Sequence, residues 1–200
     1  MNGLSMLFSF SFLFLPVLFV GTIIYLLVRR RNGGIVINAY YALMSYFHLV
    51  TAASVVTASV GIGYLAFAAL SLVYGGRKPI GDDLTLGFTL LGTGAVICAL
   101  HVWGRRAVEK REEKATTTLR RIYLFSMLAI FSLTGLWAVP VAIHDTARYY
   151  FTGYRQGNVP AESLAVALVA APLWAYYLWR VLRELRGSGP TDGTTAVRPS

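Results

Sequence analysis

The chain has 200 residues, of which 56% are hydrophobic and 14% are charged. Globular domains carry about 25% charged residues, so this composition excludes a water-soluble domain, and its apolar content excludes a largely disordered chain. The formal net charge is +9, and the single cysteine, Cys98, excludes an intramolecular disulfide and a cysteine-based zinc site.

Five apolar runs have about the length needed to cross roughly 30 Å of hydrocarbon as a helix. In chain order they are Leu7–Val28, Leu49–Tyr74, Leu84–Trp103, Ile122–Ile143 and Ser163–Trp179. The first run has no positive charge before it and is followed by three arginines, so we interpret it as a retained anchor and not a cleaved signal peptide. We therefore predict an all-α membrane protein with five transmembrane helices.

The second apolar stretch is longer than one span, since it extends from about Ile35 to Tyr74. Its first part contains three tyrosines and one histidine, whose amphipathic rings favour the headgroup region. We place the span in the second part. Two spans joined by a tight turn also fit the length, although Gly61-Ile62-Gly63 is only a weak turn signal.

Lysines and arginines are distributed unequally between the two sides of these spans. Fourteen lie after the first span, between the third and fourth spans or after the fifth, and four lie in the two other loops. The acidic residues divide five to four, so one side carries a formal charge of +9 and the other carries none. The positive-inside rule then predicts a multi-pass protein of the inner (cytoplasmic) membrane, with its N-terminus outside and its C-terminus in the cytoplasm.

Two segments of the chain look alike. Tyr46–Gly76 and Tyr123–Gly153 each extend 31 residues from a tyrosine to a glycine, and each leads to a loop, a return span and an aromatic and basic segment. We predict an anchor followed by two parallel copies of a helical hairpin. The predicted domains are an anchor and turn at 1–34, hairpins at 35–118 and 119–185, and a disordered tail at 186–200.

Parallel repeats of this kind occur in transporters, but they also arise by duplication of a packing unit. Intramembrane charges usually mark ion paths and proton relays, and the five predicted spans contain no Asp, Glu, Lys or Arg. The sequence therefore favours duplication for packing.

The second hairpin begins with LRRIYLFSMLAIFSL (119–133) and ends with PLWAYYLWRVLREL (172–185). With these segments, the region from about Tyr40 to Leu185 resembles the bacterial membrane domain of unknown function 5671, which is frequent in Chloroflexota and often present in tandem. The resemblance implies a helical membrane fold. It supplies no catalytic residues, because that family has no established activity.

His48 and His101 fall near the same ends of adjacent predicted spans, so they can face each other and hold a haem or chlorin through axial imidazoles. Neither lies deep in the hydrocarbon, and the corresponding positions of the second copy are Phe125 and Tyr177. We therefore favour hydrogen-bonding roles at the interface for both histidines. We predict no bound cofactor, no metal site and no catalytic residue.

Small residues recur within the predicted spans, mostly at a spacing of four. They are Ser163, Ala167, Ala171 and Ala175 in the last span, Ser54, Ala58 and Gly61 in the second, and Gly92 in the third. Small residues let helix backbones approach closely in lipid. We expect these stripes to pack within the chain and some to dock onto a partner, since five helices cannot all use them internally.

The sequence therefore favours a non-catalytic accessory or scaffold subunit that packs against a larger membrane complex. Its expected partners are membrane lipids and other membrane proteins or further copies of itself, and not nucleic acid, because anionic headgroups account for the basic side. The alternative is a small transporter or cofactor-binding membrane protein that uses His48 and His101. No phosphate loop, HExxH or GxSxG motif is present, so we expect no enzyme activity.

Overall fold

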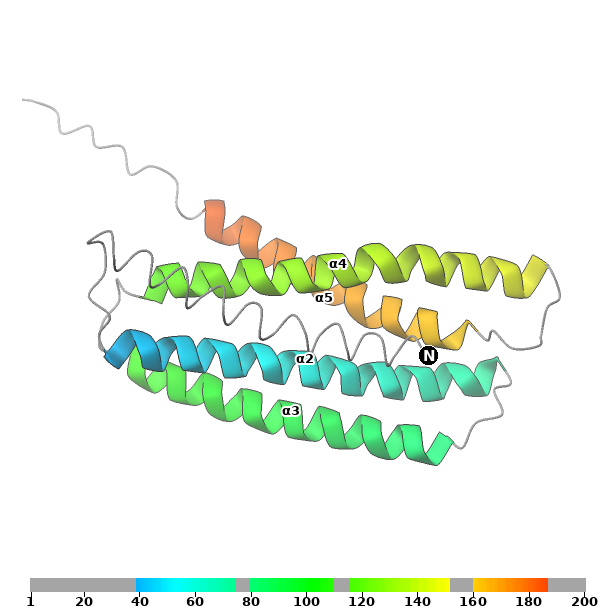
Figure 1. The fold of residues 1–200 in the computed structure, drawn as a ribbon, viewed down its shortest axis with the longest axis horizontal. Helices are drawn as coiled ribbons and strands as arrows, with labels where there is room; N and C mark the ends of the chain where they lie inside the picture. The colour runs from blue at the N-terminus through cyan, green and yellow to red at the C-terminus, as the bar shows by residue number, and fades with distance from the viewer. Residues whose placement is uncertain (1–38, 75–79, 110–115, 152–159, 187–200) are drawn as a thin grey trace, which may run out of the picture.

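The structure is a computed structural model of the 200-residue chain, and it describes residues 39–74, 80–109, 116–151 and 160–186. These residues form four helices and no strand (Figure 1). The helices are α2 (Ala39–Val73), α3 (Ile80–Glu109), α4 (Thr116–Phe151) and α5 (Ala161–Arg186).

All four helices are long and apolar enough to cross a membrane. They contain 26 to 36 residues, which corresponds to about 39–54 Å at ~1.5 Å per residue. The hydrocarbon core of a bilayer is only about 30 Å thick. The helices are therefore long enough to cross the hydrocarbon and reach the headgroup layers, or to cross it with a tilt.

The helices form two antiparallel hairpins, α2 with α3 and α4 with α5 (Figure 1). The hairpins meet mainly through α2, which packs against both α4 and α5. By contrast, α3 packs almost entirely against α2 and lies at the edge of the described bundle. Most of the circumference of α3 is therefore left uncovered by the other described helices.

The core of the described bundle lies between α2, α4 and α5. Its main cluster consists of Val56 of α2, Leu124, Met127, Ile130 and Phe131 of α4, and Tyr177 and Val181 of α5. A smaller cluster contains Ala138 and Val166. No residue of α3 belongs to either cluster, which agrees with its peripheral position.

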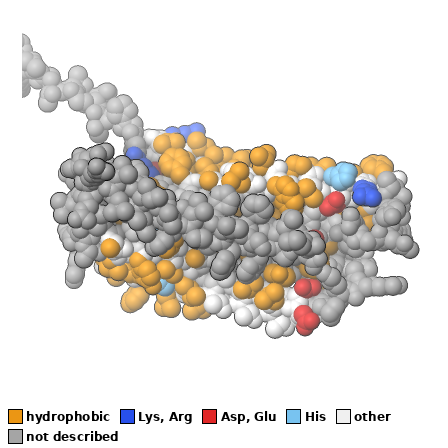
Figure 2. All heavy atoms as spheres, in the orientation of Figure 1, with side chains coloured by type: hydrophobic (Ala, Val, Ile, Leu, Met, Phe, Trp, Pro, Cys, Tyr) orange, Lys and Arg blue, Asp and Glu red, His pale blue; other side chains and the backbone are white. Residues whose placement is uncertain are grey.

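The two ends of the bundle differ in charge. The starts of α2 and α4 lie beside the ends of α3 and α5 (Figure 1), and we call this the basic end. Its charged residues within the described helices are Arg105, Arg106, Arg120, Arg121, Arg180, Arg183, Arg186, Glu109 and Glu184. Those of the opposite end are Asp82, Asp83, Asp145, Glu162 and Arg148. Figure 2 shows hydrophobic side chains along the visible face and acidic side chains gathered toward one end.

Four hydroxyl groups in the middle of α2 are satisfied by their own helix, whereas the buried Oγ of Ser45 has no hydrogen-bond partner among the described residues. Thr51, Ser54, Thr57 and Ser59 each donate to the carbonyl oxygen four residues earlier, at 2.7–2.9 Å. Because hydrocarbon holds no water, this local bonding lets a hydroxyl group lie inside a bilayer without another partner. These side chains therefore fit a packed transmembrane helix and do not require a water-filled path.

The predicted all-helical fold is confirmed for the described residues, which contain four of the five predicted spans. The first predicted span, Leu7–Val28, and the predicted tail beyond Arg186 lie outside the described residues. The alternative of two spans within the second apolar stretch is wrong, because α2 is continuous from Ala39 to Val73.

The helices also extend further than the predicted spans. The charged segment at 104–121, between the third and fourth predicted spans, is helical at both ends, since α3 continues to Glu109 and α4 already begins at Thr116. Arginine and glutamate are good helix formers, and their long side chains let a helix continue into the headgroup layer. Hydropathy therefore locates a span but not the ends of its helix.

Candidate functional site

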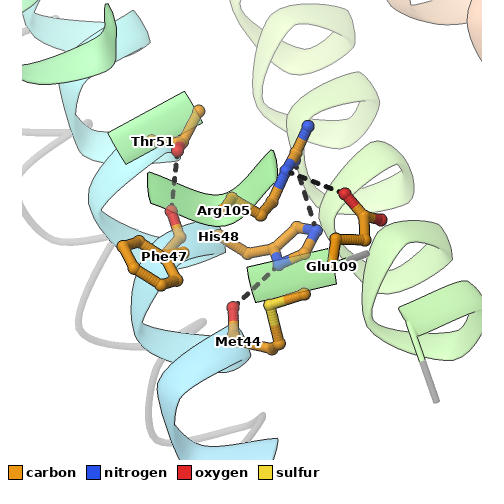
Figure 3. A network of polar contacts seen from close by, with 6 residues as sticks. All are labelled: Met44, Phe47, His48, Thr51, Arg105 and Glu109. Carbon is orange, nitrogen blue, oxygen red and sulfur yellow. Dashed lines mark hydrogen bonds and ion pairs between the residues drawn. The ribbon is translucent and has the colours of Figure 1, made fainter. Parts of the chain in front are cut away.

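His48 lies near the basic end, on α2, and its side chain is only 6% exposed. Its Nδ1–H donates to the carbonyl oxygen of Met44 at 2.8 Å (Figure 3). Because a carbonyl oxygen can only accept, this bond assigns a hydrogen to Nδ1 and leaves the lone pair of a neutral ring on Nε2. The ring also packs edge-on against Tyr123 of α4, with centroids 5.5 Å apart. His48 thus joins the two hairpins at this end.

Arg105 approaches His48 from the last part of α3 (Figure 3). Its Nη1 lies 3.5 Å from Nε2 of His48, so the guanidinium donates to the lone pair of the ring. Its Nε lies 3.8 Å from Oε2 of Glu109, one turn further along α3. That Nε is buried and has no hydrogen-bond partner among the residues described. The pairing of this cation is therefore weak.

A second group of charges links α4 to α5 at the same end. Nη2 of Arg120 makes a close contact with the carboxylate of Glu184, and Nε of Arg121 lies 3.9 Å from the same carboxylate. Nearby, the hydroxyl groups of Tyr123 and Tyr177 lie 3.2 Å apart. Two arginines of α4 thus approach one carboxylate of α5.

His101 has different neighbours from His48. Its Nδ1–H donates to the carbonyl oxygen of Ile97 at 2.8 Å, and its Nε2 lies 3.3 Å from the hydroxyl group of Tyr46, which donates to it. Its ring packs against Tyr46 and Phe47. The structure therefore does not bring the two imidazoles together, because each Nε2 already faces a side chain of the neighbouring helix. Among the described residues, no group of three or more His, Cys, Asp or Glu side chains is placed to hold a metal ion.

The small residues of α2 lie at its contact with α3. A Cβ atom added to Gly94 of α3 would lie 2.7 Å from the backbone nitrogen of Ala58 and 2.8 Å from the carbonyl oxygen of Ser54. A Cβ atom on Gly61 would lie 2.5 Å from the backbone nitrogen of Leu91. Ser54, Ala58 and Gly61 therefore form a surface on which the α3 backbone lies directly, as expected for small residues in lipid.

The stripe predicted on α5 follows the buried face only in part. Ser163 is buried, Ala167 and Ala171 are partly buried, and Ala175 is exposed. A strict spacing of four advances about 40° around a helix at every step, because a turn has about 3.6 residues. The buried line instead alternates steps of three and four residues and passes through Ser163, Val166, Ala170, Leu173 and Tyr177.

The outer face of α3 carries a row of residues that the sequence alone does not identify as one surface. Gly92 was predicted as a packing residue, but it faces open space within the described structure. It belongs to a series at alternating steps of four and three residues, and every member is exposed. The members are Thr85, Thr89, Gly92, Val96, Ala99 and Trp103, which we call the α3 seam. The spacing alone was visible in the sequence, but only the structure shows that this face has no partner among the described helices.

A cavity of about 50 Å³ lies between the hairpins, bordered by α2, α4 and α5. Its walls are mainly apolar, with Val60, Phe131 and Val169 among the lining residues. The hydroxyl groups of Ser59 and Thr134 border it, but both donate to carbonyl oxygens of their own helices. The cavity therefore offers little polar recognition for a transported solute.

Four long apolar helices with polar ends define an all-helical membrane protein as the class to which this chain belongs. Within that class, the chain belongs to the family described as domain of unknown function DUF5671, which matches residues 45–158. The match confirms the family that the sequence resembles, over residues 45–158 of the region from about Tyr40 to Leu185. No curated protein and no solved structure matches the chain.

The matched region contains α3, most of α2 and all of α4, and it ends before α5 begins. It runs across the predicted boundary between the hairpins at 118 and 119. The match therefore gives no support to two separate copies of the family domain, and the duplication stays a prediction.

Proposed function

We propose that this protein is a non-catalytic accessory or scaffold subunit of a larger membrane complex, and that the α3 seam receives an apolar transmembrane helix of a partner chain. The observation that carries the proposal is the row of six residues on α3, which no other described helix covers. As expected from the sequence, we propose no enzyme activity for the chain.

The α3 seam has the spacing of a helix-packing surface. Steps of four and three residues correspond to a period of 3.5, at which a row of side chains stays facing one neighbouring helix over several turns. Five of its six members are small or β-branched, and small residues favour close helix association in lipid. The hydroxyl groups of Thr85 and Thr89 donate to carbonyl oxygens of their own helix, at 2.8 and 2.7 Å, so they need no polar partner.

We further propose that the chain crosses the inner membrane five times, with Leu7–Val28 as the first span, the N-terminus outside and the basic end in the cytoplasm. The support is the unequal distribution of lysine and arginine, with 14 on one side and 4 on the other. We also propose that the two halves are similar because a hairpin that serves for packing was duplicated.

The test is purification of tagged protein from native membranes in a mild detergent, with mass spectrometry of the proteins that accompany it. We expect a stoichiometric membrane complex with the wild type and its loss in Gly92→Leu, because a leucine side chain would hold the partner backbone away from the seam. Gly135→Leu is the matched control, since Gly135 lies in α4 and also has open space around its Cβ position.

Recovery of the wild-type protein alone would contradict the proposal, and so would equal behaviour of the two leucine variants. If the complex contains only copies of this chain and Gly92→Leu dissociates it, the helix on the α3 seam belongs to a second copy and not to another protein.

A further inference from the structure

Arg105 is the charged side chain whose environment is least explained by the bundle itself. Its side chain is 21% exposed, and its buried Nε has no hydrogen-bond partner among the described residues. Its carboxylate neighbour, Glu109, lies at 3.8 Å, beyond hydrogen-bond distance. A guanidinium carries five N–H donors, and a largely buried cation is costly unless anions or other acceptors satisfy it. Glu109 therefore neutralises this cation only weakly, and the exposed part of the side chain can accept an additional anion.

The position of Arg105 along α3 indicates where that anion comes from. Trp103, two residues earlier, is 73% exposed, and Trp179 of α5 is exposed at the same end of the bundle. Exposed tryptophans of membrane helices favour the headgroup level of the bilayer. Arg105 therefore lies at the depth where the phosphate groups of phospholipids are found.

The surroundings of Arg105 are positive on more than one helix. Tyr123, whose ring contacts His48, lies one turn after Arg120 on α4. Arg105 of α3 and Arg120 of α4 thus bring arginines of both hairpins to the basic end, and the guanidinium of Arg120 is paired with Glu184.

We propose that Arg105 binds the phosphate group of an anionic phospholipid at the basic end of the bundle. A guanidinium presents parallel N–H groups that match two phosphate oxygens. His48 acts as a positioning residue, because its Nε2 accepts from Nη1 of Arg105 and its Nδ1–H is held by Met44. Nη2 and the second N–H of Nη1 then remain to hold the lipid phosphate, because Nε is buried. Glu109 competes with the phosphate for the same guanidinium.

The test measures lipid binding to the purified full chain in a neutral detergent by native mass spectrometry. Phosphatidylglycerol is titrated as the anionic lipid and phosphatidylcholine as the zwitterionic one. We expect Arg105→Gln to weaken binding of the first phosphatidylglycerol by about 10- to 100-fold, as for loss of charge-assisted hydrogen bonds. Arg106→Gln is the matched control: it removes the same charge from the next, exposed position. It should weaken binding by no more than about fivefold, as for one basic residue near an anionic surface.

A second variant keeps the test decisive if Arg105→Gln does not fold. Glu109→Gln should strengthen phosphatidylglycerol binding several-fold, because it removes the competing carboxylate. Asp82→Asn makes the same change in total charge at the opposite end and should leave binding unchanged. Equal effects of Arg105→Gln and Arg106→Gln, weaker binding in Glu109→Gln, or equal affinity for phosphatidylcholine would each overturn the proposal.

Inorganic phosphate distinguishes a lipid headgroup from a free anion. We expect millimolar phosphate to leave phosphatidylglycerol bound, because the acyl chains add apolar contact that a free ion lacks. Displacement of the lipid by phosphate at equal concentration would overturn the assignment to a lipid. Because Arg105 lies outside the α3 seam, this result is independent of the co-purification result with Gly92→Leu.

Discussion

Tyr123 and Tyr177 join the two helices of the second hairpin through their hydroxyl groups, which lie 3.2 Å apart. Tyr177 is 4% exposed and stacks on Phe131, with ring centroids 5.6 Å apart. A buried phenol usually has a hydrogen-bond partner, and apolar surroundings provide no water to replace it. Each hydroxyl group is therefore the other's partner at this position.

We expect Tyr177→Phe to lower the free energy of unfolding by about 0.6 kcal/mol, the average for such hydrogen bonds within membranes. Tyr176→Phe is the matched control, because Tyr176 is the preceding residue and is 47% exposed. Denaturation with sodium dodecyl sulfate in mixed micelles measures both values. In a Tyr123→Phe background, Tyr177→Phe should cost nothing further, and an undiminished cost there would show that the two hydroxyl groups do not interact.

The pairing of α2 with α3 depends on backbone contact at glycine. Gly61 and Gly94 each leave no room for a Cβ atom, because backbone atoms of the opposite helix lie within 3.0 Å of its position. Leucine-rich surfaces cannot hold two helices this close in lipid, where no hydrophobic force favours association. The close contact between the backbones therefore identifies which sides of α2 and α3 meet.

We expect Gly94→Ala to lower the free energy of unfolding by about 1–3 kcal/mol, since the added methyl group forces the two backbones apart. Gly92→Ala, two residues earlier on the same helix, faces open space and should be neutral or slightly stabilising. The same detergent titration compares the two variants. Equal loss of stability in both would contradict the close packing of α2 on α3.

At the scale of the whole molecule, charge separates the two ends of the bundle. Within the described helices, the basic end carries seven arginines and two glutamates, and the opposite end carries four acidic residues and one arginine. Lysine and arginine are retained on the cytoplasmic side during insertion, so this separation predicts orientation. In the proposed orientation, Arg105 lies beside the cytoplasmic leaflet, which is richer in anionic lipid.

Orientation can be measured with single cysteines in a Cys98→Ala background. A membrane-impermeant maleimide should label Asp82→Cys in intact cells and should label Arg106→Cys only after the membrane is opened. Asn2→Cys should also be labelled in intact cells if Leu7–Val28 crosses the membrane as proposed. The reverse pattern at positions 82 and 106 would contradict the proposed orientation, and a protected Asn2→Cys would contradict the fifth span.

The helical class and the positions of α2 to α5 were predictable from hydropathy, because in lipid each helix must satisfy its own backbone hydrogen bonds whatever its neighbours are. The small residues Ser54, Ala58 and Gly61 were recognisable for the same reason, since few other residue types allow backbones to meet. His48 and His101 were correctly placed near the same ends of their helices, but not in the same environment.

Only the folded bundle shows which side of each helix contacts its neighbours. Apolar residues cover all sides of these helices, so periodicity does not separate lipid-facing from core-facing positions, and Ala175 and Gly92 lie outside the buried surfaces. Arg105 and His48 are 57 positions apart, and they meet because α2 and α3 pair at the particular rotation set by their glycines. Close packing at these glycines, which acts over short distances and depends on shape, decides that rotation.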